Sequence, residues 1–234
     1  MINRARRALG ARLRAARFLR AFPPPTPADV LTIGDPDYGG YQVPQGLLGP
    51  DSVVVSAGAG TDVSFESMLV SRFGCRIHLL DPVPESREYV VEALGHEPRI
   101  TYECAALWSE ETELRFHAPE IVGHVSHSAT DLHHTPPVFT APARTLRSLR
   151  AQHRWDRIDL LKISAEGAEF EILAAVLADD EPVSAICVEF AQPVRVAAVT
   201  GAIDRLAAAD YRLLARSVRP FNWKLTFVRA DRSV

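Results

Sequence analysis

Val53 to Glu66 read VVVSAGAGTDVSFE, and this stretch decides the fold. Its three consecutive valines are typical of a strand that is buried on both faces of a parallel sheet. Gly58 and Gly60 follow, and glycine lets the backbone turn sharply and approach a ligand without a Cβ in the way. Apolar residues then recur at helical spacing from Phe65 to Phe73. The stretch therefore predicts a strand, a glycine turn and a helix whose N-terminus points at a ligand.

A second apolar strand, Ile77 to Leu80, ends at Asp81, roughly twenty residues after the glycines. An acid at this place can accept hydrogen bonds from the two hydroxyls of a ribose. A dinucleotide site usually has a third small residue after the glycines, and Val63 at this position disfavours it. The chain has no GxxxxGK[ST] sequence, which is the motif of a nucleoside triphosphate site. S-adenosylmethionine, which has a ribose and an adenine but no phosphate, fits the pattern better.

Length and charge narrow the class of protein further. A chain of 234 residues is long enough for one large domain with a substantial core. The first 22 residues hold seven arginines and no acid, and the others hold 19 basic against 29 acidic residues, a net charge of −10. This acidic body argues against nucleic acid as the principal partner. Three cysteines without CxxC spacing indicate reduced side chains in a cytoplasmic protein, and no apolar run is long enough to span a bilayer.

The N-terminal part reads as an extension of the main domain. Residues 1–22 predict an arginine-rich helix, and the four prolines in residues 23–30 predict a stiff linker to a domain over residues 31–234. The helix has an apolar stripe that includes Leu9 and Leu13. We expect a solvated or frayed terminal helix, and weak docking on a membrane surface or a protein partner is the alternative.

Strands and helices alternate along the rest of the chain, which predicts an α/β fold with a doubly wound, mostly parallel sheet. A strand from Ile100 to Ala106 would end next to the glycine turn, where an adenine would rest. The buried strand Ile158 to Ile163 runs into Ser164 and Glu166. Polar residues at the carboxyl end of a parallel strand belong to the ligand-binding edge of such a sheet. The last two strands are expected to form a closing antiparallel pair.

Two groups of residues outside these strands are candidates for the site. His124 to His134 contains four of the eight histidines, but it is loop-like and has a single acid, so we predict no metal site. His127 is the candidate for an acid or base that faces a substrate. Tyr38 and Tyr41 lie in a turn-rich segment, where they either cover the nucleoside pocket or pack beneath a loop.

Taken in order, these segments resemble the FkbM-type family of S-adenosylmethionine-dependent methyltransferases from about Tyr38 to Arg229. The landmarks are GGYQVPQGLL, DSVVVSAGAGTDVSFE, FGCRIHLLDPVPES, HVSHS, IDLLKISAEGAEFEIL, ICVEF and LTFV. The resemblance implies the class I methyltransferase fold, a Rossmann-like seven-stranded sheet with an antiparallel last strand. It also implies S-adenosylmethionine as the cofactor and O-methylation of a hydroxyl on a sugar or natural product, so the partner is a small-molecule or glycan acceptor.

The resemblance also assigns residues. It places the methionine end of the cofactor near the glycine turn and the ribose on Asp81, and it leaves Glu166 and His127 as catalytic candidates. The family usually has aspartate where this chain has Ser164, within LKISAEG. Serine cannot carry a negative charge or accept a proton, so a weak or inactive methyltransferase-like binding protein is the alternative. The expected cofactor-binding residues are Ser56, Gly58, Gly60, Asp81, Ala106 and Ser164.

Overall fold

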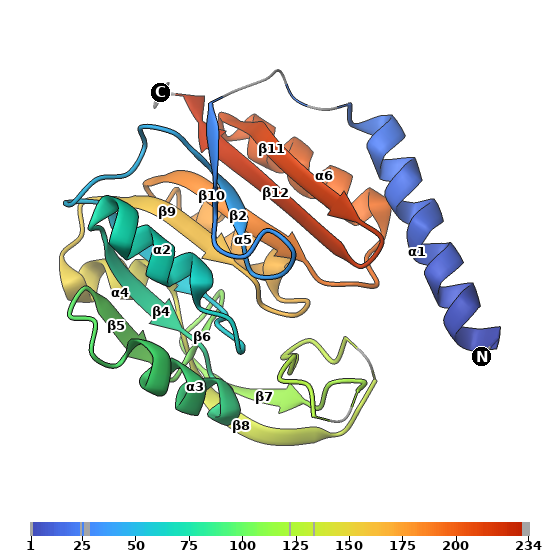
Figure 1. The fold of residues 1–234 in the computed structure, drawn as a ribbon, viewed down its shortest axis with the longest axis horizontal. Helices are drawn as coiled ribbons and strands as arrows, with labels where there is room; N and C mark the ends of the chain where they lie inside the picture. Colours follow the sequence, from blue (N-terminus) through green and yellow to red (C-terminus); the bar gives the residue numbers. More distant parts are fainter. Residues whose placement is uncertain (1, 24, 26–28, 122, 133, 231–234) are drawn as a thin grey trace.

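The computed structural model describes residues 2–23, 25, 29–121, 123–132 and 134–230 (Figure 1). Its main sheet has seven strands in the order β11-β12-β10-β9-β3-β4-β5. The five strands from β10 to β5 are parallel, whereas β12 is antiparallel to both of its neighbours. The strands are β3 (Val53–Ala57), β4 (Arg76–Leu80), β5 (Ile100–Glu103), β9 (Ile158–Ile163), β10 (Val183–Phe190), β11 (Tyr211–Arg219) and β12 (Asn222–Arg229). The predicted mostly parallel sheet with an antiparallel closing strand is confirmed.

Helices cover both faces of this sheet (Figure 1). One face carries α2 (Ser64–Phe73), α3 (Pro84–Leu94) and the hairpin of β1 (Val30–Ile33) and β2 (Tyr41–Pro44). The other carries α4 (Leu146–His153), α5 (Glu169–Ala178) and α6 (Val196–Ala208). Successive side chains of a strand point to opposite faces, so Val54 packs in the first core and Val55 in the second. This two-sided burial explains why the central strands are continuously apolar.

The chain leaves the main sheet after β5. The amide of Ala105 donates to the carbonyl of Glu103 at 2.9 Å, and β6 (Ala106–Leu107) then pairs with β8 (Pro137–Arg144). β8 also pairs with β7 (Glu113–His117), which completes a three-stranded sheet. The prediction of one strand over residues 100–106 is therefore wrong. We call this small sheet and the loop of residues 118–136 the arm.

Helix α1 (Ile2–Ala21) packs at the edge of the molecule beside β11 and α6 (Figure 1). Phe18 is buried, and its ring lies 4.7 Å from that of Trp223 on β12. Leu9 and Leu13, from the predicted apolar stripe, remain exposed. The helix is solvated along this stripe, as expected, but a different face of it docks through Ala11, Ala15 and Phe18, which the sequence did not predict.

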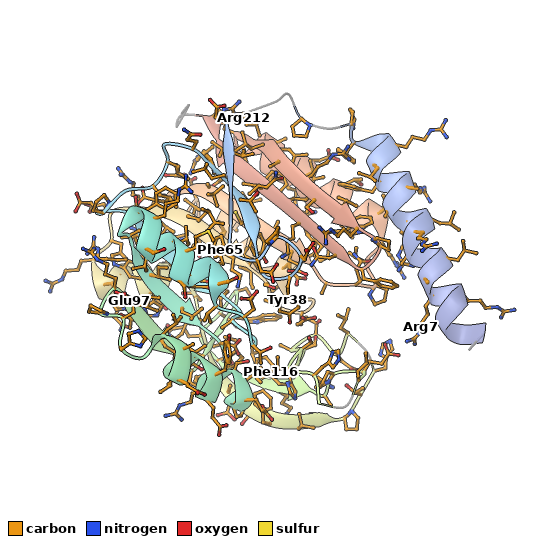
Figure 2. The ribbon with its side chains drawn as sticks, viewed as in Figure 1. Arg7, Tyr38, Phe65, Glu97, Phe116 and Arg212 are labelled. Atoms are coloured by element: carbon orange, nitrogen blue, oxygen red, sulfur yellow. The ribbon has the colours of Figure 1, made fainter. Side chains whose placement is uncertain are left out.

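Two further observations concern the N-terminal part. Arg7 lies on the side of α1 nearest the arm, where its guanidinium pairs with Glu120 (Figure 2). Of the predicted linker, Pro24 and residues 26–28 lie outside the described residues. Within the described residues, none of the helices combines the length and the apolar character needed to cross a membrane.

Candidate active site

The carboxyl ends of β3, β4, β9 and β10 border a cavity of about 580 Å³. Small-molecule sites in proteins have volumes of roughly 300 to 1,000 Å³. The arm closes the cavity opposite the sheet edge, and both contribute lining residues. Figure 2 labels two of these residues, Tyr38 before β2 and Phe116 on β7. The cavity therefore lies where strand topology predicts a ligand in an open α/β sheet.

The glycine turn after β3 is built tightly against the neighbouring strand. Gly58 has a φ of +86°, and a Cβ at this position would lie 1.9 Å from the carbonyl oxygen of Ser164. Its amide donates to the carbonyl of Leu80 at 2.8 Å, and the ammonium of Lys162 donates to its carbonyl. β4 and β9 thus fix the turn from both sides. Only glycine meets the conformational and steric demands at position 58.

Asp81 stabilises the same turn with its carboxylate. Oδ2 accepts the amides of Ala59 and Gly60 at 2.8 and 2.9 Å, and Oδ1 accepts the amide of Val83 at 2.9 Å. A carboxylate has about four acceptor positions, so one remains for a ligand hydroxyl. Asp81 lines the cavity although it is nearly fully buried. The position suits the predicted ribose contact. Asp81 also holds the glycine turn in place, which the sequence did not show.

Ser56 is placed differently from its predicted role. It is fully buried and is absent from the described cavity lining. Its hydroxyl donates to Glu66 Oε1 at 2.5 Å, and the same oxygen lies 3.6 Å from the ammonium of Lys162. Ser56 therefore belongs to a buried polar network that links β3, α2 and β9. Because this side chain bonds inside the protein, the structure lends no support to the expectation that it contacts the cofactor.

Three carboxylates line the part of the cavity near β9 and β10, namely Glu166, Glu169 and Glu189. Burial raises the pKa of Glu166 to about 6, the charge of Glu189 adds to this effect, and a hydrogen bond from Ser126 opposes it. Burial also raises the pKa of Glu169 to about 7, although its oxygens accept the amide of Gly167. A carboxyl with a pKa near neutrality can take up and return a proton at working pH.

Glu189 sits in a hydrogen-bond network that sequence reasoning missed. It lies 3.3 Å from the hydroxyl of Tyr41, 2.6 Å from Nδ2 of Asn222 and 3.7 Å from the ammonium of Lys224. Burial holds the pKa of Tyr41 well above its ordinary value, so its phenol remains a donor. Burial lowers the pKa of Lys224, and Glu189 opposes that change. The sequence held one signal of a buried charged site. The chain has only two lysines, Lys162 and Lys224, and both are buried.

His127 lines the cavity from the arm. Its Nδ1 lies 3.2 Å from the carbonyl oxygen of Val125. A carbonyl only accepts hydrogen bonds, so in the neutral imidazole Nδ1 carries the proton and Nε2 is the acceptor. The hydroxyl of Ser128 donates to the carbonyl of Glu166 at 2.6 Å, which ties this loop to the segment after β9. The two catalytic candidates therefore lie on segments that are bonded to each other.

The structure brings most of the predicted site residues together. Around the cavity lie Gly58, Gly60, Asp81, Ala106, Ser164, Glu166 and His127. Both tyrosines that the sequence left open, Tyr38 and Tyr41, also line it. His134 is exposed and His133 lies outside the described residues. In the part of the chain that the structure describes, no three side chains of the usual ligand types are grouped as a metal site.

The strand order, the antiparallel β12 and the glycine turn over a buried acid define a protein of the class I methyltransferase type. The sequence profile of the Methyltransferase FkbM domain matches residues 55–213, and the chain belongs to this family. It is a methyltransferase that depends on S-adenosylmethionine. No curated protein matches the sequence.

Several solved structures are similar to this chain at low identity. The precorrin-6y C5,15-methyltransferase of Geobacter metallireducens is 14% identical over 77% of this chain and 81% of its own, with a TM-score of 0.45. The fibrillarin of Aeropyrum pernix, which contains natively bound S-adenosylmethionine, is 11% identical over 80% of this chain and 70% of its own, with a TM-score of 0.44. A putative RNA methyltransferase of Pyrococcus horikoshii is 10% identical over 78% and 75%, with a TM-score of 0.43.

The residues around the cavity fit S-adenosylmethionine. Gly60 leaves space that a Cβ would fill, since the nearest atom to its Cβ position is in Val125 at 3.7 Å, and Asp81 keeps an acceptor position for a ribose hydroxyl. Ala106 and Leu107 add apolar surface of the kind that packs on an adenine. The cavity is also lined by carboxylates, which suits a ligand with a positive charge.

Proposed function

We propose that the protein methylates a hydroxyl group on a sugar or natural product, with Glu166 as the general base. One observation carries this proposal: Glu166 lines the cavity and its pKa is raised to about 6. When bound, S-adenosylmethionine supplies a methyl group that its sulfonium sulfur has already activated. The protein then has to align the acceptor, which can contribute about 7 to 11 kcal/mol in favourable cases.

The chain's own residues divide this work. Gly58, Gly60 and Asp81 hold the nucleoside and methionine end of the cofactor. Glu166 accepts a hydrogen bond from the acceptor hydroxyl and takes its proton as the oxygen attacks, which is worth about 10² to 10⁴ in rate. Nε2 of His127 is the second candidate for this proton, since its lone pair is free.

We infer further that the acceptor is a small molecule or glycan rather than a nucleic acid. The described cavity mouth includes three exposed apolar side chains, Tyr38, Ile121 and Phe221. Such side chains pack on sugar rings and on natural products, whereas the carboxylates inside repel a phosphate backbone. The net charge of −10 outside the first 22 residues adds to that repulsion. The three cysteines are free, and this supports a reducing compartment such as the cytoplasm.

The test is methyl transfer from S-adenosylmethionine carrying a labelled methyl group to a panel of sugars, glycosides and hydroxylated natural products. We expect Glu166→Gln to lower the rate by about 10² or more and His127→Ala by about tenfold. Glu171→Gln is the matched control, because Glu171 is exposed on α5 and has the same charge. If neither site variant slows transfer by even tenfold, the assignment of the base is wrong.

Ser164 favours a second candidate function, a methyltransferase-like binding protein with weak or no catalysis. Its hydroxyl lines the cavity where family sequences usually have an acid. This candidate predicts tight binding of S-adenosylmethionine without transfer to any member of the panel. It also predicts that Ser164→Asp creates activity, whereas our main proposal predicts transfer by the native chain.

A further inference from the structure

Position 164 has serine where the family resemblance leads us to expect an acid, and a carboxylate lies beside it on the next strand. β9 and β10 are parallel, and Ile163 pairs with Val188, so Ser164 and Glu189 follow side by side. The hydroxyl of Ser164 lies 3.5 Å from Oε2 of Glu189. A negative charge is therefore present within one side-chain length of the place where the family usually has one.

This carboxylate is held in a fixed position. Tyr41 from β2 and Asn222 from β12 donate to its two different oxygens, and Lys224 approaches the same oxygen as Tyr41. The side chain of Glu189 is still 25% exposed, and it lines the cavity. Tyr41, Asn222 and Ser164 donate to a carboxylate that has about four acceptor positions, so one position remains for a ligand.

Ser164 lies between Glu189 and the glycine turn. Gly58 packs against the backbone of Ser164 so closely that no Cβ fits between them. The methionine end of the cofactor is expected over this turn, and Ser164 separates the turn from Glu189. The ammonium group at that end is a cation with three donors, which pairs well with a partly buried carboxylate.

The other carboxylates near the turn bind groups of the turn, its flanking loops or the core. Asp81 accepts three backbone amides, and Glu66 is fully buried against Ser56 and Lys162. Asp62 accepts the amides of Gly39 and Ser64. Glu189 lies directly beside Ser164, is held by hydrogen bonds and lines the cavity, as Glu166 and Glu169 do farther along the chain.

We propose that Glu189 supplies the carboxylate that position 164 lacks, and that it binds the ammonium group at the methionine end of the cofactor. The proposal rests on S-adenosylmethionine as the cofactor and does not depend on which acceptor is methylated. The site keeps its negative charge and carries it on β10 instead of β9. Ser164 then acts as a neutral hydrogen-bonding neighbour.

The test compares two ligands by calorimetry. S-adenosylhomocysteine has the amino-acid end, whereas 5′-methylthioadenosine has the nucleoside and the sulfur but no ammonium group. We expect Glu189→Gln to weaken binding of S-adenosylhomocysteine by about 10- to 100-fold, the usual range for a hydrogen bond to a charged group. Binding of 5′-methylthioadenosine should change by less than threefold, and Glu171→Gln should change neither. Equal weakening of both ligands, or no change in either, would overturn the proposal.

A charge swap covers the case in which Glu189→Gln disturbs folding around Lys224. Ser164→Asp combined with Glu189→Gln returns a carboxylate to the usual family position. We expect the double variant to regain at least tenfold of the lost affinity for S-adenosylhomocysteine. A double variant that binds 5′-methylthioadenosine normally, yet binds S-adenosylhomocysteine no better than Glu189→Gln, would contradict the swap.

Ser164→Asp alone separates this proposal from the functional ones. It places two carboxylates side by side, so we expect no gain in affinity for S-adenosylhomocysteine. A gain of tenfold or more would show that Glu189 does not supply the charge. These binding measurements need no acceptor, so a failed acceptor screen does not affect the result on Glu189. A negative result on Glu189 likewise does not affect the acceptor screen.

Discussion

The two halves of the cavity are held by different kinds of interaction. The turn half is formed by Gly58, Gly60, Asp81 and Ala106. In it, backbone amides donate to a buried carboxylate, and the backbone at Gly58 packs closely against Ser164. In the carboxylate half, formed by Glu166, Glu169, Glu189 and His127, side-chain charges gather around open space. Burial there raises the pKa values of Glu166 and Glu169.

The difference reflects what each half has to do. The turn half meets a constant ligand, so its polar groups can be satisfied in advance by the fold. The carboxylate half has to handle a proton and a cation, and groups that do this keep part of their bonding capacity free. We therefore expect substitutions in the turn half to damage folding and binding together. Substitutions in the carboxylate half should change charge-dependent properties first.

The largest effect is expected for Gly58→Ala. The new Cβ would lie 1.9 Å from a backbone oxygen, and the residue would also keep a φ of +86°. We expect a loss of more than about 3 kcal/mol in the free energy of unfolding, and no measurable binding of S-adenosylhomocysteine. Gly123→Ala is the matched control, since Gly123 has a φ of +87° and no atom within 4 Å of its Cβ position. It should lose only about 1 kcal/mol. Equal losses in urea unfolding would show that the contact with Ser164 is unimportant.

Phe18→Ala is expected to have the next largest effect, and it acts on the carboxylate half from outside. Phe18 is fully buried against Trp223, which lies between Asn222 and Lys224 in the sequence. Removing a buried phenylalanine ring typically lowers the free energy of unfolding by about 3 to 5 kcal/mol. At a temperature where the variant is folded, binding of S-adenosylhomocysteine should weaken more than binding of 5′-methylthioadenosine.

Leu13→Ala provides the control on the same helix. Leu13 is 63% exposed, so its truncation should change the free energy of unfolding by less than about 0.5 kcal/mol. If urea unfolding of the two variants has the same midpoint, α1 does not brace the carboxylate half and acts as an independent extension.

The sequence predicts the turn half well because its signals are local. A strand, a glycine turn and an acid at the end of the next strand lie within about thirty residues of a βαβ unit. Parallel strands place their carboxyl ends at one edge of the sheet, so Gly58, Asp81 and Glu166 could be grouped in advance. The burial of Ser56 could not be read from the motif, because position in a motif does not show which way a strand side chain points. Its hydroxyl bonds to Glu66 instead of facing the cavity.

The carboxylate half could be predicted only in part. Glu166 followed from its place after a buried strand and from the family resemblance, and His127 followed from a histidine-rich loop, but the network around Glu189 joins residues from β2, β10 and β12. The antiparallel register that pairs Glu189 with Lys224 is fixed by packing of the whole sheet, and no local pattern encodes it. The docking of α1 was missed for a similar reason, since an alanine- and arginine-rich helix offers more than one apolar face.

The smallest expected effect is a shift in pH dependence within the carboxylate half. Glu166 must be ionised to take a proton, and its pKa is raised to about 6, so kcat/KM should rise with pH and level off above about 7. Glu189 raises this pKa through its negative charge. In Glu189→Gln the rising limb should therefore move to lower pH, because the loss of a neighbouring anion lowers the pKa of Glu166.

A pH profile of Gly60→Ala separates this shift from a general loss of activity. Gly60 lies in the turn half, where a Cβ would come no closer than 3.7 Å to Val125. Its variant should have a lower kcat/KM because the turn is strained at a φ of +56°, yet the midpoint of the rising limb should stay near pH 6. A limb that moves equally in both variants would mean that the two halves titrate as one unit. A limb that moves only in Glu189→Gln would show that the charges near β9 and β10 set the proton affinity of the base independently of the turn.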